Sequence, residues 1–529
     1  MKRILMIGDI GWSRFYHLGD EAMTEFALDA LHARADVEVT LIAGEPEHAG
    51  EMYGVSAISR IGFRRNRPPN IVRMTNVLRY AETGGSEGGL DPEDPAIGVI
   101  EAVKNADAVL IAGGGNLNSM FAHHIYERAT VAKLATMFGK PYALTSQTLG
   151  PLIYDEDRPL VHDLLAGAEF VGTRESYTTK LAGDLGAGDA AIRRQVDDAF
   201  SLAARDEDRA AVADLVSEPF ILASFAEKAS SPMISDKQYH SRLVELCTRL
   251  VDETGLRVLL VPHGGALPPE EETRDQITNA QIASATGTEA VQPVRMLTAR
   301  ELIALTERAE FVIGTRYHAG IFAGAAAVPF ISLSPNLYSA IRMRGAAENV
   351  GMTDFVLPLD SVDDIVATAV GVARDRDALQ EVLRSQAEAR LAEHREWWDF
   401  VVANTIGLRE DLQPGADVRQ SGEAADRQSP GFFHAEEHPN SYIANIALSR
   451  ERLSALADYG LVLAKKDRRL ALAREEAAVA TRRLEVLERR SDRQANSRVF
   501  RAARAAQKVS RRVRLTARGA IARSPFGSR

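Results

Sequence analysis

Short apolar runs alternate with polar, glycine-punctuated turns and helix-like segments over the first 400 residues. A first series of apolar runs occupies residues 2–7, 37–43, 106–112, 141–146 and 170–173. A second series occupies residues 220–225, 256–261, 311–313 and 329–333. Apolar runs of this kind are typical of buried strands. Because they alternate with helical segments, the pattern predicts an α/β fold with parallel sheets.

A polar stretch over residues 205–213 separates the two series and is the expected domain boundary. We therefore predict an N-terminal Rossmann-like domain over residues 1–204 and a C-terminal Rossmann-like domain over residues 205–409. The second includes a long helix at 376–400 that returns to the first domain. Two such domains, with glycines and cations at their strand ends, would face a cleft. The segment 45–96 contains Pro and Gly clusters and is expected to be an irregular insertion.

The C-terminal part of the chain has a different composition. Residues 410–445 are rich in Gly, Asp, Gln, Ser and Pro, which is typical of a linker. Over residues 446–490 a spacing of seven joins Leu456, Leu463, Leu470, Ala477 and Leu484, so we predict a helical coiled-coil extension that could join copies into a homo-oligomer. Residues 491–529 form a basic, alanine-rich tail.

Composition and charge narrow the class of protein. A single cysteine, Cys247, argues against a disulfide framework and a cysteine-rich zinc site, and it fits a reducing cytoplasm. No run approaches the roughly 18 apolar residues of a membrane span, and the start lacks a signal-peptide pattern. Residues 491–529 contain eleven Lys or Arg and one acid, so the tail carries +10 and the remaining 490 residues carry −20. This asymmetry indicates either an anionic partner for the tail or a solvated charged segment.

The strongest candidate for chemistry is the stretch at residues 311–320. Its apolar strand ends at Gly314, and a helix of small residues follows, which places Arg316 and His318 at a strand-to-helix turn. In an open α/β sheet, ligands bind at this end of the strands. A guanidinium, an imidazole and a helix N-terminus together suit a phosphate or carboxylate. The alternative is a surface arginine with a capping histidine.

Two further strand ends carry candidate binding residues. The run 106–112 ends in Gly113, Gly114 and Gly115, followed by Asn116, which permits close backbone approach to a ligand. The alternative is a tight turn that needs glycine only for its geometry. His263 follows the strand at 256–261 and would face the same cleft, or it is simply a turn histidine. The first turn lacks a G-x-G-x-x-G fingerprint, which disfavours a dinucleotide cofactor.

Taken together, an ordered set of motifs resembles the polysaccharide pyruvyl transferase family over roughly residues 1 to 400. These motifs are Leu18-Gly19-Asp20-Glu21, Gly113-Gly114-Gly115, Gln147-Thr148-Leu149-Gly150-Pro151, Thr173-Arg174-Glu175-Ser176, Val196-Asp197-Asp198-Ala199-Phe200 and Arg316-Tyr317-His318. Two departures stand out. His17 occupies the position where the family usually has Asn, and the turn at residues 146–151 has lost glycines.

The resemblance implies a GT-B-like fold and transfer of pyruvate from phosphoenolpyruvate to sugar hydroxyls as a ketal. It implies that Arg174, Arg316 and His318 hold the donor, with Tyr317 beside them. A histidine of near-neutral pKa suits proton delivery or the stabilisation of leaving phosphate. Asp20 or Glu21 could take the hydroxyl proton; the alternative is an N-cap and first-turn acid of the following helix. The reaction needs no metal and no cofactor.

Two rival functions remain open from the sequence. One is a GT-B glycosyltransferase that uses a nucleotide sugar, and the other is a non-catalytic scaffold that works through its C-terminal helix. The expected partners are phosphoenolpyruvate and a glycan acceptor of a cell-surface polysaccharide or its lipid-linked precursor. Residues 446–529 could bind an anionic membrane surface or a protein, which would place the enzyme in the cytoplasm, at the inner face of the membrane. Nothing in the body resembles a base-contacting module, so no nucleic acid is expected.

Overall fold

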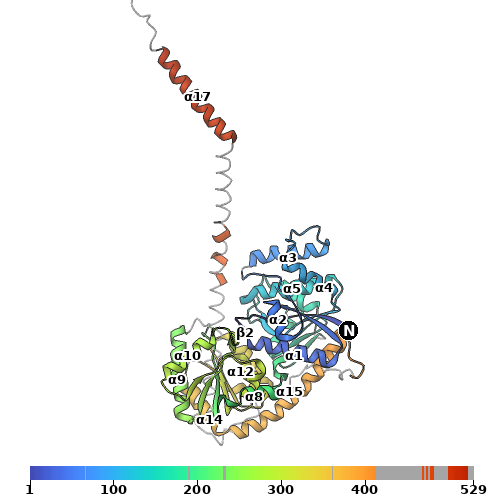
Figure 1. Ribbon diagram of the computed structural model, residues 1–529, viewed down its shortest axis with the longest axis vertical. Coiled ribbons are helices and arrows are strands. Elements are labelled where there is room, and N and C mark those ends of the chain that lie inside the picture. Colours follow the sequence, from blue (N-terminus) through green and yellow to red (C-terminus); the bar gives the residue numbers. More distant parts are fainter. Residues whose placement is uncertain are drawn as a thin grey trace, which may run out of the picture. The chain divides into compact units, whose positions relative to one another are not determined.

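The computed structural model divides the chain into two units, Met1–Gly460 and Leu461–Arg529, which are described separately (Figure 1). The structure describes residues 1–65, 67–188, 191–229, 234–359, 361–412, 468–469, 472–474, 477–479, 481 and 498–521.

The N-terminal half of the first unit is built on a parallel sheet. Its strands are β1 (Lys2–Ile7), β3 (Val37–Ala43), β4 (Ser56–Ser59), β5 (Ala108–Ile111), β6 (Gly114–Leu117), β7 (Tyr142–Leu149), β8 (Val171–Thr173) and β9 (Ile192–Arg194). Their order is β4-β3-β1-β5-β7-β8-β9, and β6 pairs with β7. Every residue of β5 and β7 is buried, which explains the apolar run of β5 and means that the polar side chains of β7, from Thr145 to Thr148, are buried as well.

Helices cover this sheet and also occupy the segment expected to be irregular. They are α1 (Leu18–Arg34), α2 (Pro46–Tyr53), α3 (Arg67–Glu82), α4 (Pro95–Asn105), α5 (Ala122–Met137), α6 (Arg158–Ala166) and α7 (Ser176–Asp184). The prediction of an irregular insertion at residues 45–96 is therefore wrong, since α2, β4 and α3 lie within it. Proline in the first turn of a helix removes no intrahelical hydrogen bond, so Pro46, Pro68 and Pro69 start these helices instead of breaking them.

The C-terminal half repeats the arrangement. Its strands are β10 (Phe220–Ser224), β11 (Arg257–Leu260), β13 (Val291–Pro293), β14 (Phe311–Gly314), β15 (Phe330–Ser334) and β16 (Val356–Pro358). Its helices are α8 (Asp206–Ala211), α9 (Asp236–Thr254), α10 (Asp275–Thr286), α11 (Ala299–Thr306), α12 (Tyr317–Ala325), α13 (Leu337–Asn349) and α14 (Val362–Arg374). The strand order β13-β11-β10-β14-β15-β16 is parallel throughout.

Both sheets have a switch point where the strand order reverses, between β1 and β5 in one half and between β10 and β14 in the other. Ligands of doubly wound sheets bind outside the carboxyl ends of the strands at such points. Two links join the halves there. The antiparallel pair β2 (Tyr16–His17) and β12 (Gly264–Gly265) contains one strand from each half, and the amide of Leu18 donates to the His263 carbonyl at 3.1 Å.

The long helix α15 (Arg376–Thr405) follows the C-terminal half and packs against the N-terminal half. Its Trp397 and Trp398 are fully buried in one apolar cluster with Ile4 and Met6 of β1. Arg34, at the end of α1, donates from Nε to Asp399 at 2.6 Å. The first sheet is therefore covered by the last helix of the body, as Figure 1 shows in orange beside the blue elements.

In the second unit, the described residues include the helix α17 (Arg498–Ile521). Most of the predicted linker at 410–445 and of the predicted coiled coil at 446–490 lies outside the described residues; the described residues between 468 and 481 are helical. Among the helices that the structure describes, none combines the length and the apolar character needed to cross a membrane.

Candidate active site

The predicted site residues gather at the carboxyl ends of the strands of both halves. Arg174 directly follows β8, and Arg316 and His318 follow β14. Arg316 is the N-cap of α12, and His318 lies in its first turn. His263 follows β11, and Asp20 lies in the first turn of α1. The structure therefore brings residues from the two halves together near the links formed by β2 and β12.

The Asp197 carboxylate holds Arg174, the first cation of the site, and it also lies near His318 from the other half. Arg174 is 1% exposed, and its Nε donates to Thr148 Oγ1 at 2.7 Å while its Nη1 donates to Asp197. His318 Nε2 lies 3.6 Å from the same carboxylate. Burial opposes ionisation of Asp197, but the charge of Arg174 outweighs it and holds the Asp197 pKa below its ordinary value. The result is a buried Arg174–Asp197–His318 network.

His318 is packed so closely against α1 that only glycine fits opposite it. A Cβ added at Gly19 would overlap the imidazole ring of His318. On its other sides the ring lies against Tyr317 and Phe322. Burial lowers the pKa of His318, and the Asp197 carboxylate opposes this effect without reversing it. The imidazole is therefore held in one place and is largely neutral near pH 7.

Arg316 points its fork at a buried carboxylate. Its Nε donates to Asp275 Oδ2 at 2.9 Å, and its Nη2 donates to Oδ1. Asp275 also accepts hydrogen bonds from the backbone amides of His263 at 3.1 Å and Gly264 at 2.9 Å. The charge of Arg316 is therefore already compensated, and the residue fixes the turn that carries His263.

His263 is buried, and only one of its two ring nitrogens has a hydrogen-bond partner among the described residues. Its Nδ1 lies 2.5 Å from Ser224 Oγ, while its Nε2 has no hydrogen-bond partner among the described residues. Burial, with the nearby charge of Arg316, lowers the pKa of His263 well below its ordinary value. This neutral ring presents one free ring nitrogen beside the network.

The two acids of α1 differ in their surroundings. Asp20 hydrogen-bonds His17 Nδ1, and His17 is the helix N-cap without a side-chain capping bond. Glu21 accepts from the amide of Gly11 at 3.0 Å and from the Tyr53 hydroxyl. Burial raises the pKa of Glu21 to about 7. Glu21 therefore anchors the loop after β1, whereas Asp20 is the acid that lies toward His318.

Gly113 and the two glycines that begin β6, Gly114 and Gly115, lie against the network and against the C-terminal half. A Cβ at Gly113 would lie 2.6 Å from Met23 Sδ and 2.7 Å from Ser146 Cβ, so this position requires glycine. A Cβ at Gly114 would meet only the amide of Asn116, at 3.1 Å. Asn116 Nδ2 is buried without a hydrogen-bond partner among the described residues.

The structure places one further cation near these residues, Arg342, which the sequence did not indicate. Arg342, on α13, lies over the rings of Tyr338 at 4.0 Å and Tyr317 at 5.2 Å. Arg174 lies 4.6 Å from the same Tyr317 ring. The Tyr338 hydroxyl donates to the Gly115 carbonyl at 2.9 Å, which docks α13 on the start of β6.

Arg342 and Arg174 lie beside the same backbone position. A Cβ added at Gly115 would be 3.4 Å from Arg342 Nη1 and 3.6 Å from Arg174 Nη2. Among the described residues, Arg342 Nε has no hydrogen-bond partner, and no carboxylate forms an ion pair with its guanidinium. The only sequence signal for it is the i, i+4 spacing of Tyr338 and Arg342 on a helix after a strand.

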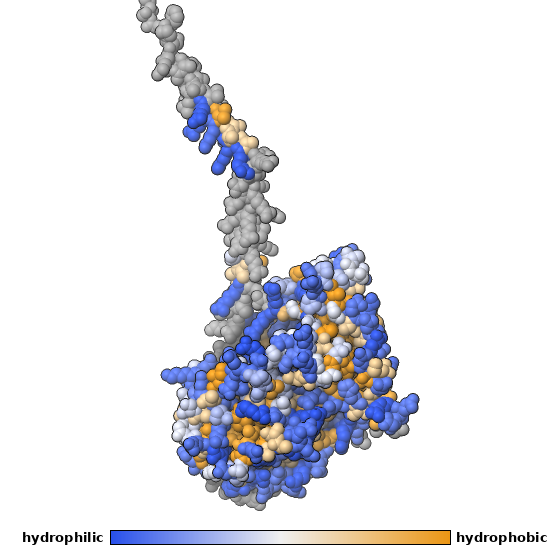
Figure 2. Space-filling model, in the orientation of Figure 1, coloured by the Kyte–Doolittle hydropathy of each residue, from blue (hydrophilic) through white to orange (hydrophobic). Residues whose placement is uncertain are grey.

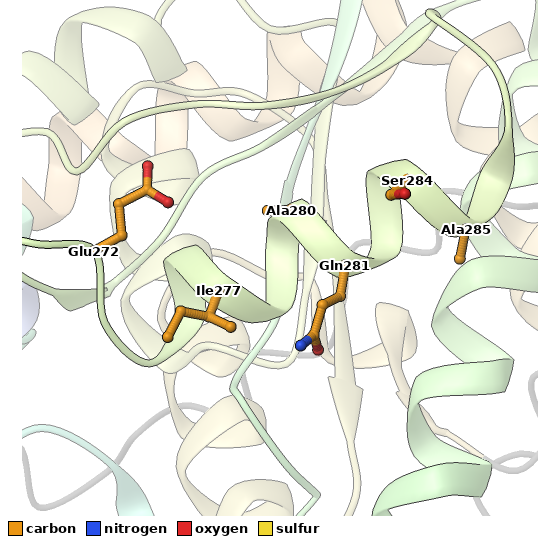
Figure 3. A pocket seen from close by; sticks show the side chains of 6 residues that line it. All are labelled: Glu272, Ile277, Ala280, Gln281, Ser284 and Ala285. Atoms are coloured by element: carbon orange, nitrogen blue, oxygen red, sulfur yellow. The ribbon is translucent and has the colours of Figure 1, made fainter.

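A separate surface hollow lies along α10, away from these cations. Figure 3 shows the side chains that surround it. Its lining residues are Glu272, Ile277, Ala280, Gln281, Ser284 and Ala285. It holds no cation or histidine, so it does not add to the site. In the described part of the chain, no three His, Cys, Asp or Glu side chains are placed to hold a metal ion.

Two parallel sheets whose strand ends share one site define a protein of the GT-B-like class. The sequence model of the polysaccharide pyruvyl transferase family matches residues 17–336, which is more than half of the chain. The chain therefore belongs to the polysaccharide pyruvyl transferase family. No curated protein matches it.

Solved structures share the fold at low identity. The UDP co-structure of MnaA from S. aureus is 13% identical and covers 77% of this chain and 98% of its own, with a TM-score of 0.50. A Listeria monocytogenes protein assigned as a UDP-N-acetylglucosamine 2-epimerase is 11% identical and covers 79% of this chain and 99% of its own, with a TM-score of 0.51. At these identities the likeness shows the GT-B-like fold alone.

Proposed function

We propose that this protein transfers pyruvate from phosphoenolpyruvate to hydroxyls of a cell-surface glycan or its lipid-linked precursor, as a ketal. The observation that carries the proposal is the pair of guanidinium groups at Gly115, of which Arg342 has no carboxylate partner among the described residues. Phosphoenolpyruvate has a phosphate and a carboxylate, and guanidinium groups bind both kinds of anion through paired hydrogen bonds.

The donor would lie between Arg174, Arg342 and the first turn of α12. The amides of that turn have no intrahelical partner, so they add donors and a partial positive charge. In this arrangement Arg316 does not contact the donor directly, because its guanidinium already donates two hydrogen bonds to Asp275. It would hold the turn of His263 in place, and His263 Nε2 would contact the donor.

His318 would supply the proton. Binding of an anionic donor next to a neutral imidazole favours its protonated form, so the donor would raise the His318 pKa that burial lowers. Proton transfer from His318 to the methylene carbon gives an oxocarbenium-like centre at the neighbouring carbon. A sugar hydroxyl then adds to this carbon.

Asp20 would take the proton of the attacking hydroxyl. Loss of inorganic phosphate and attack by a second hydroxyl complete the ketal, and the second hydroxyl proton goes to the phosphate. The balance is one phosphoenolpyruvate and two hydroxyls consumed, one ketal and one phosphate formed. No resident cofactor or metal takes part in the proposed reaction.

Titration calorimetry with phosphoenolpyruvate and with UDP-sugars tests the donor. We expect saturable binding of phosphoenolpyruvate that weakens at least tenfold in Arg342→Gln, since a charge-assisted hydrogen bond is lost. Phosphate release from phosphoenolpyruvate against a panel of acceptor glycans then tests turnover. Saturable binding of a UDP-sugar alone would replace this donor with a nucleotide sugar, and binding of neither would favour a scaffold.

We further propose that α17 holds the protein at an anionic membrane surface. Within residues 501–512 the cations are Arg501, Arg504, Lys508, Arg511 and Arg512, and no acid is present. These side chains are exposed, as is Val509 at 61%. Figure 2 shows hydrophilic and hydrophobic residues on different sides of this helix. A basic amphipathic helix of this kind lies on anionic lipid, and the cytoplasmic leaflet is where a lipid-linked acceptor would be met.

A further inference from the structure

A second group of charged side chains lies in the N-terminal half, outside the network around His318. It consists of Asp9, which follows β1, Arg60, which follows β4, and His124, Glu127 and Arg128 on α5. All five come from the carboxyl edge of the first sheet or from the first two turns of α5. None of them belongs to the motifs from which the family was recognised.

Both carboxylates of this group, those of Asp9 and Glu127, pair with one arginine, Arg60. Arg60 Nε donates to Glu127 Oε2 at 3.1 Å, and its Nη1 donates to Asp9. The other oxygen of Glu127 accepts from the backbone amide of Ile61 at 2.7 Å. The other oxygen of Asp9 lies 3.5 Å from His124 Nε2. The acids therefore compensate Arg60 and leave the second arginine of the group, Arg128, without a carboxylate.

His124 does not supply the missing negative charge. Its Nδ1 lies 3.3 Å from Arg60 Nη2 and 3.4 Å from Arg128 Nη1. Because both guanidinium groups can only donate, this nitrogen is the acceptor, and the ring proton lies on Nε2, toward Asp9. Burial lowers the His124 pKa well below its ordinary value, so the ring is neutral.

Arg128 is consequently a buried cation with unused donors. Arg128 is 1% exposed, and its Nε and Nη2 have no hydrogen-bond partner in the described chain. Burial, together with the charge of Arg60, lowers its pKa to about 10. A buried charged donor without a partner costs free energy, and an anion placed against Nε and Nη2 removes this cost.

Neighbouring side chains extend the group toward solvent. His123 has a buried Nδ1 without a hydrogen-bond partner in the part of the chain that the structure describes, and the exposed Arg65 acts electrostatically on this ring. Asp20, the candidate base, acts on the charge of Arg128. An anion bound at Arg128 would therefore lie within electrostatic range of the residue that takes the acceptor's proton.

We propose that Arg128, with His123 and Arg65, binds an anionic group of the acceptor, either a phosphoryl or a carboxylate. This site rests on the proposed function for the identity of its ligand as the acceptor. The acceptor is then a charged glycan, and its hydroxyls point from Arg128 toward Asp20. Because Arg128 is covered in this structure, entry of the anion requires the side chains above it to move.

Calorimetry on the full chain tests this site with two probes, inorganic pyrophosphate and glucuronate, each titrated with and without saturating phosphoenolpyruvate. We expect one probe to bind saturably in both conditions, and the probe that binds identifies the anion as phosphoryl or carboxylate. Arg128→Gln should weaken that binding at least tenfold, and Arg65→Gln several-fold. Arg79→Gln, an exposed arginine of the same half paired with Glu87, is the matched control.

Arg65 is exposed, so Arg65→Gln keeps the test valid if Arg128→Gln fails to fold. Binding that is unchanged in both variants, that is removed by phosphoenolpyruvate, or that is absent for both probes overturns the proposal. Failure of phosphoenolpyruvate itself to bind would remove the proposed donor instead, and the titration without it would still measure the Arg128 site.

Discussion

The contact between Gly19 and His318 links the first helix of one half to the first turn of α12 in the other. Since a Cβ at Gly19 would overlap the imidazole, the smallest possible side chain at this position must displace His318 or push the halves apart. Gly19, which lies in the N-terminal half, therefore sets the position of the His318 ring relative to Asp197.

His318→Gln should lower turnover by about 10²-fold or more, the usual effect of removing a positioned acid. Gly19→Ala should give a similar loss, because it moves the ring although it leaves the histidine in place. Gly98→Ala is the matched control, since a Cβ at Gly98, inside α4, meets nothing within 4 Å. Steady-state phosphate release from phosphoenolpyruvate measures all three variants.

Near-full turnover of His318→Gln would remove His318 from the chemical step. Full turnover of Gly19→Ala, with His318→Gln inactive, would mean instead that the ring tolerates displacement. Circular dichroism and thermal unfolding of each variant separate these outcomes from a loss of fold.

The sequence predicted which residues stand at strand ends, because a strand end is a local property of an apolar run and the turn after it. It did not predict what those residues contact. The carboxylate of Asp275 lies 41 positions from Arg316 along the chain, and Arg342 reaches Gly115 from the other half. Such pairings depend on the packing of distant elements, so no local pattern contains them.

At the scale of elements, the strands in the middle of each sheet were predicted, whereas α2, β4 and α3 were not. β5, β10 and β14 are buried along their whole length, so their apolar runs stand out from the surrounding sequence. In contrast, α3 buries only Asn70 and Val77. A helix with so few buried positions has no clear apolar stripe. The prolines in its first turn, Pro68 and Pro69, also made this segment resemble a loop in the sequence.

α17 should bind anionic vesicles. Each Lys or Arg near an anionic surface contributes about 1 kcal/mol, and salt weakens this attraction. We expect the full-length protein to co-sediment with vesicles that contain phosphatidylserine at low salt and less so at physiological salt. A chain that ends at Arg490 should stay in the supernatant. Neutral vesicles are the control, and equal sedimentation of both chains, or of neither, would exclude a membrane role for α17.

At the scale of the whole molecule, several connections hold the halves of the body together, and three of them join whole elements. These are the β2–β12 pair, the docking of Tyr338 on Gly115, and the packing of α15 on the first sheet. The loop after β1 leads directly into β2, and Glu21 anchors this loop through Gly11. The protonation state of Glu21 therefore bears on the stability of the entire body.

Glu21 should make the protein less stable as the pH rises from about 4.5 to 7. Burial raises its pKa from 4.5 to about 7, so in this range the folded state retains a proton that the unfolded chain has released. Stability is then highest below the unfolded pKa and falls as the pH passes through the folded pKa. In Glu21→Gln, the side chain facing Tyr53, Asp20 and His17 no longer titrates.

The advantage of Glu21→Gln over the wild type in unfolding free energy should grow by up to about 2–3 kcal/mol between pH 5 and pH 8. Urea unfolding at both pH values measures it. Glu51→Gln, an exposed acid on α2, should leave the difference unchanged. If the two variants behave alike, Glu21 is ionised in the folded protein throughout this range.

The packing of α15 on the first sheet also determines when the core of that sheet can be completed during synthesis. Ile4 and Met6 leave the ribosome nearly 400 residues before Trp397 and Trp398, which complete their core. At ordinary synthesis rates this interval lasts roughly 20–80 s. During that time one apolar face of the nascent first sheet lacks its cover, so ribosome-associated chaperones have a defined surface to protect. Emergence of the last helix of the body ends that exposure.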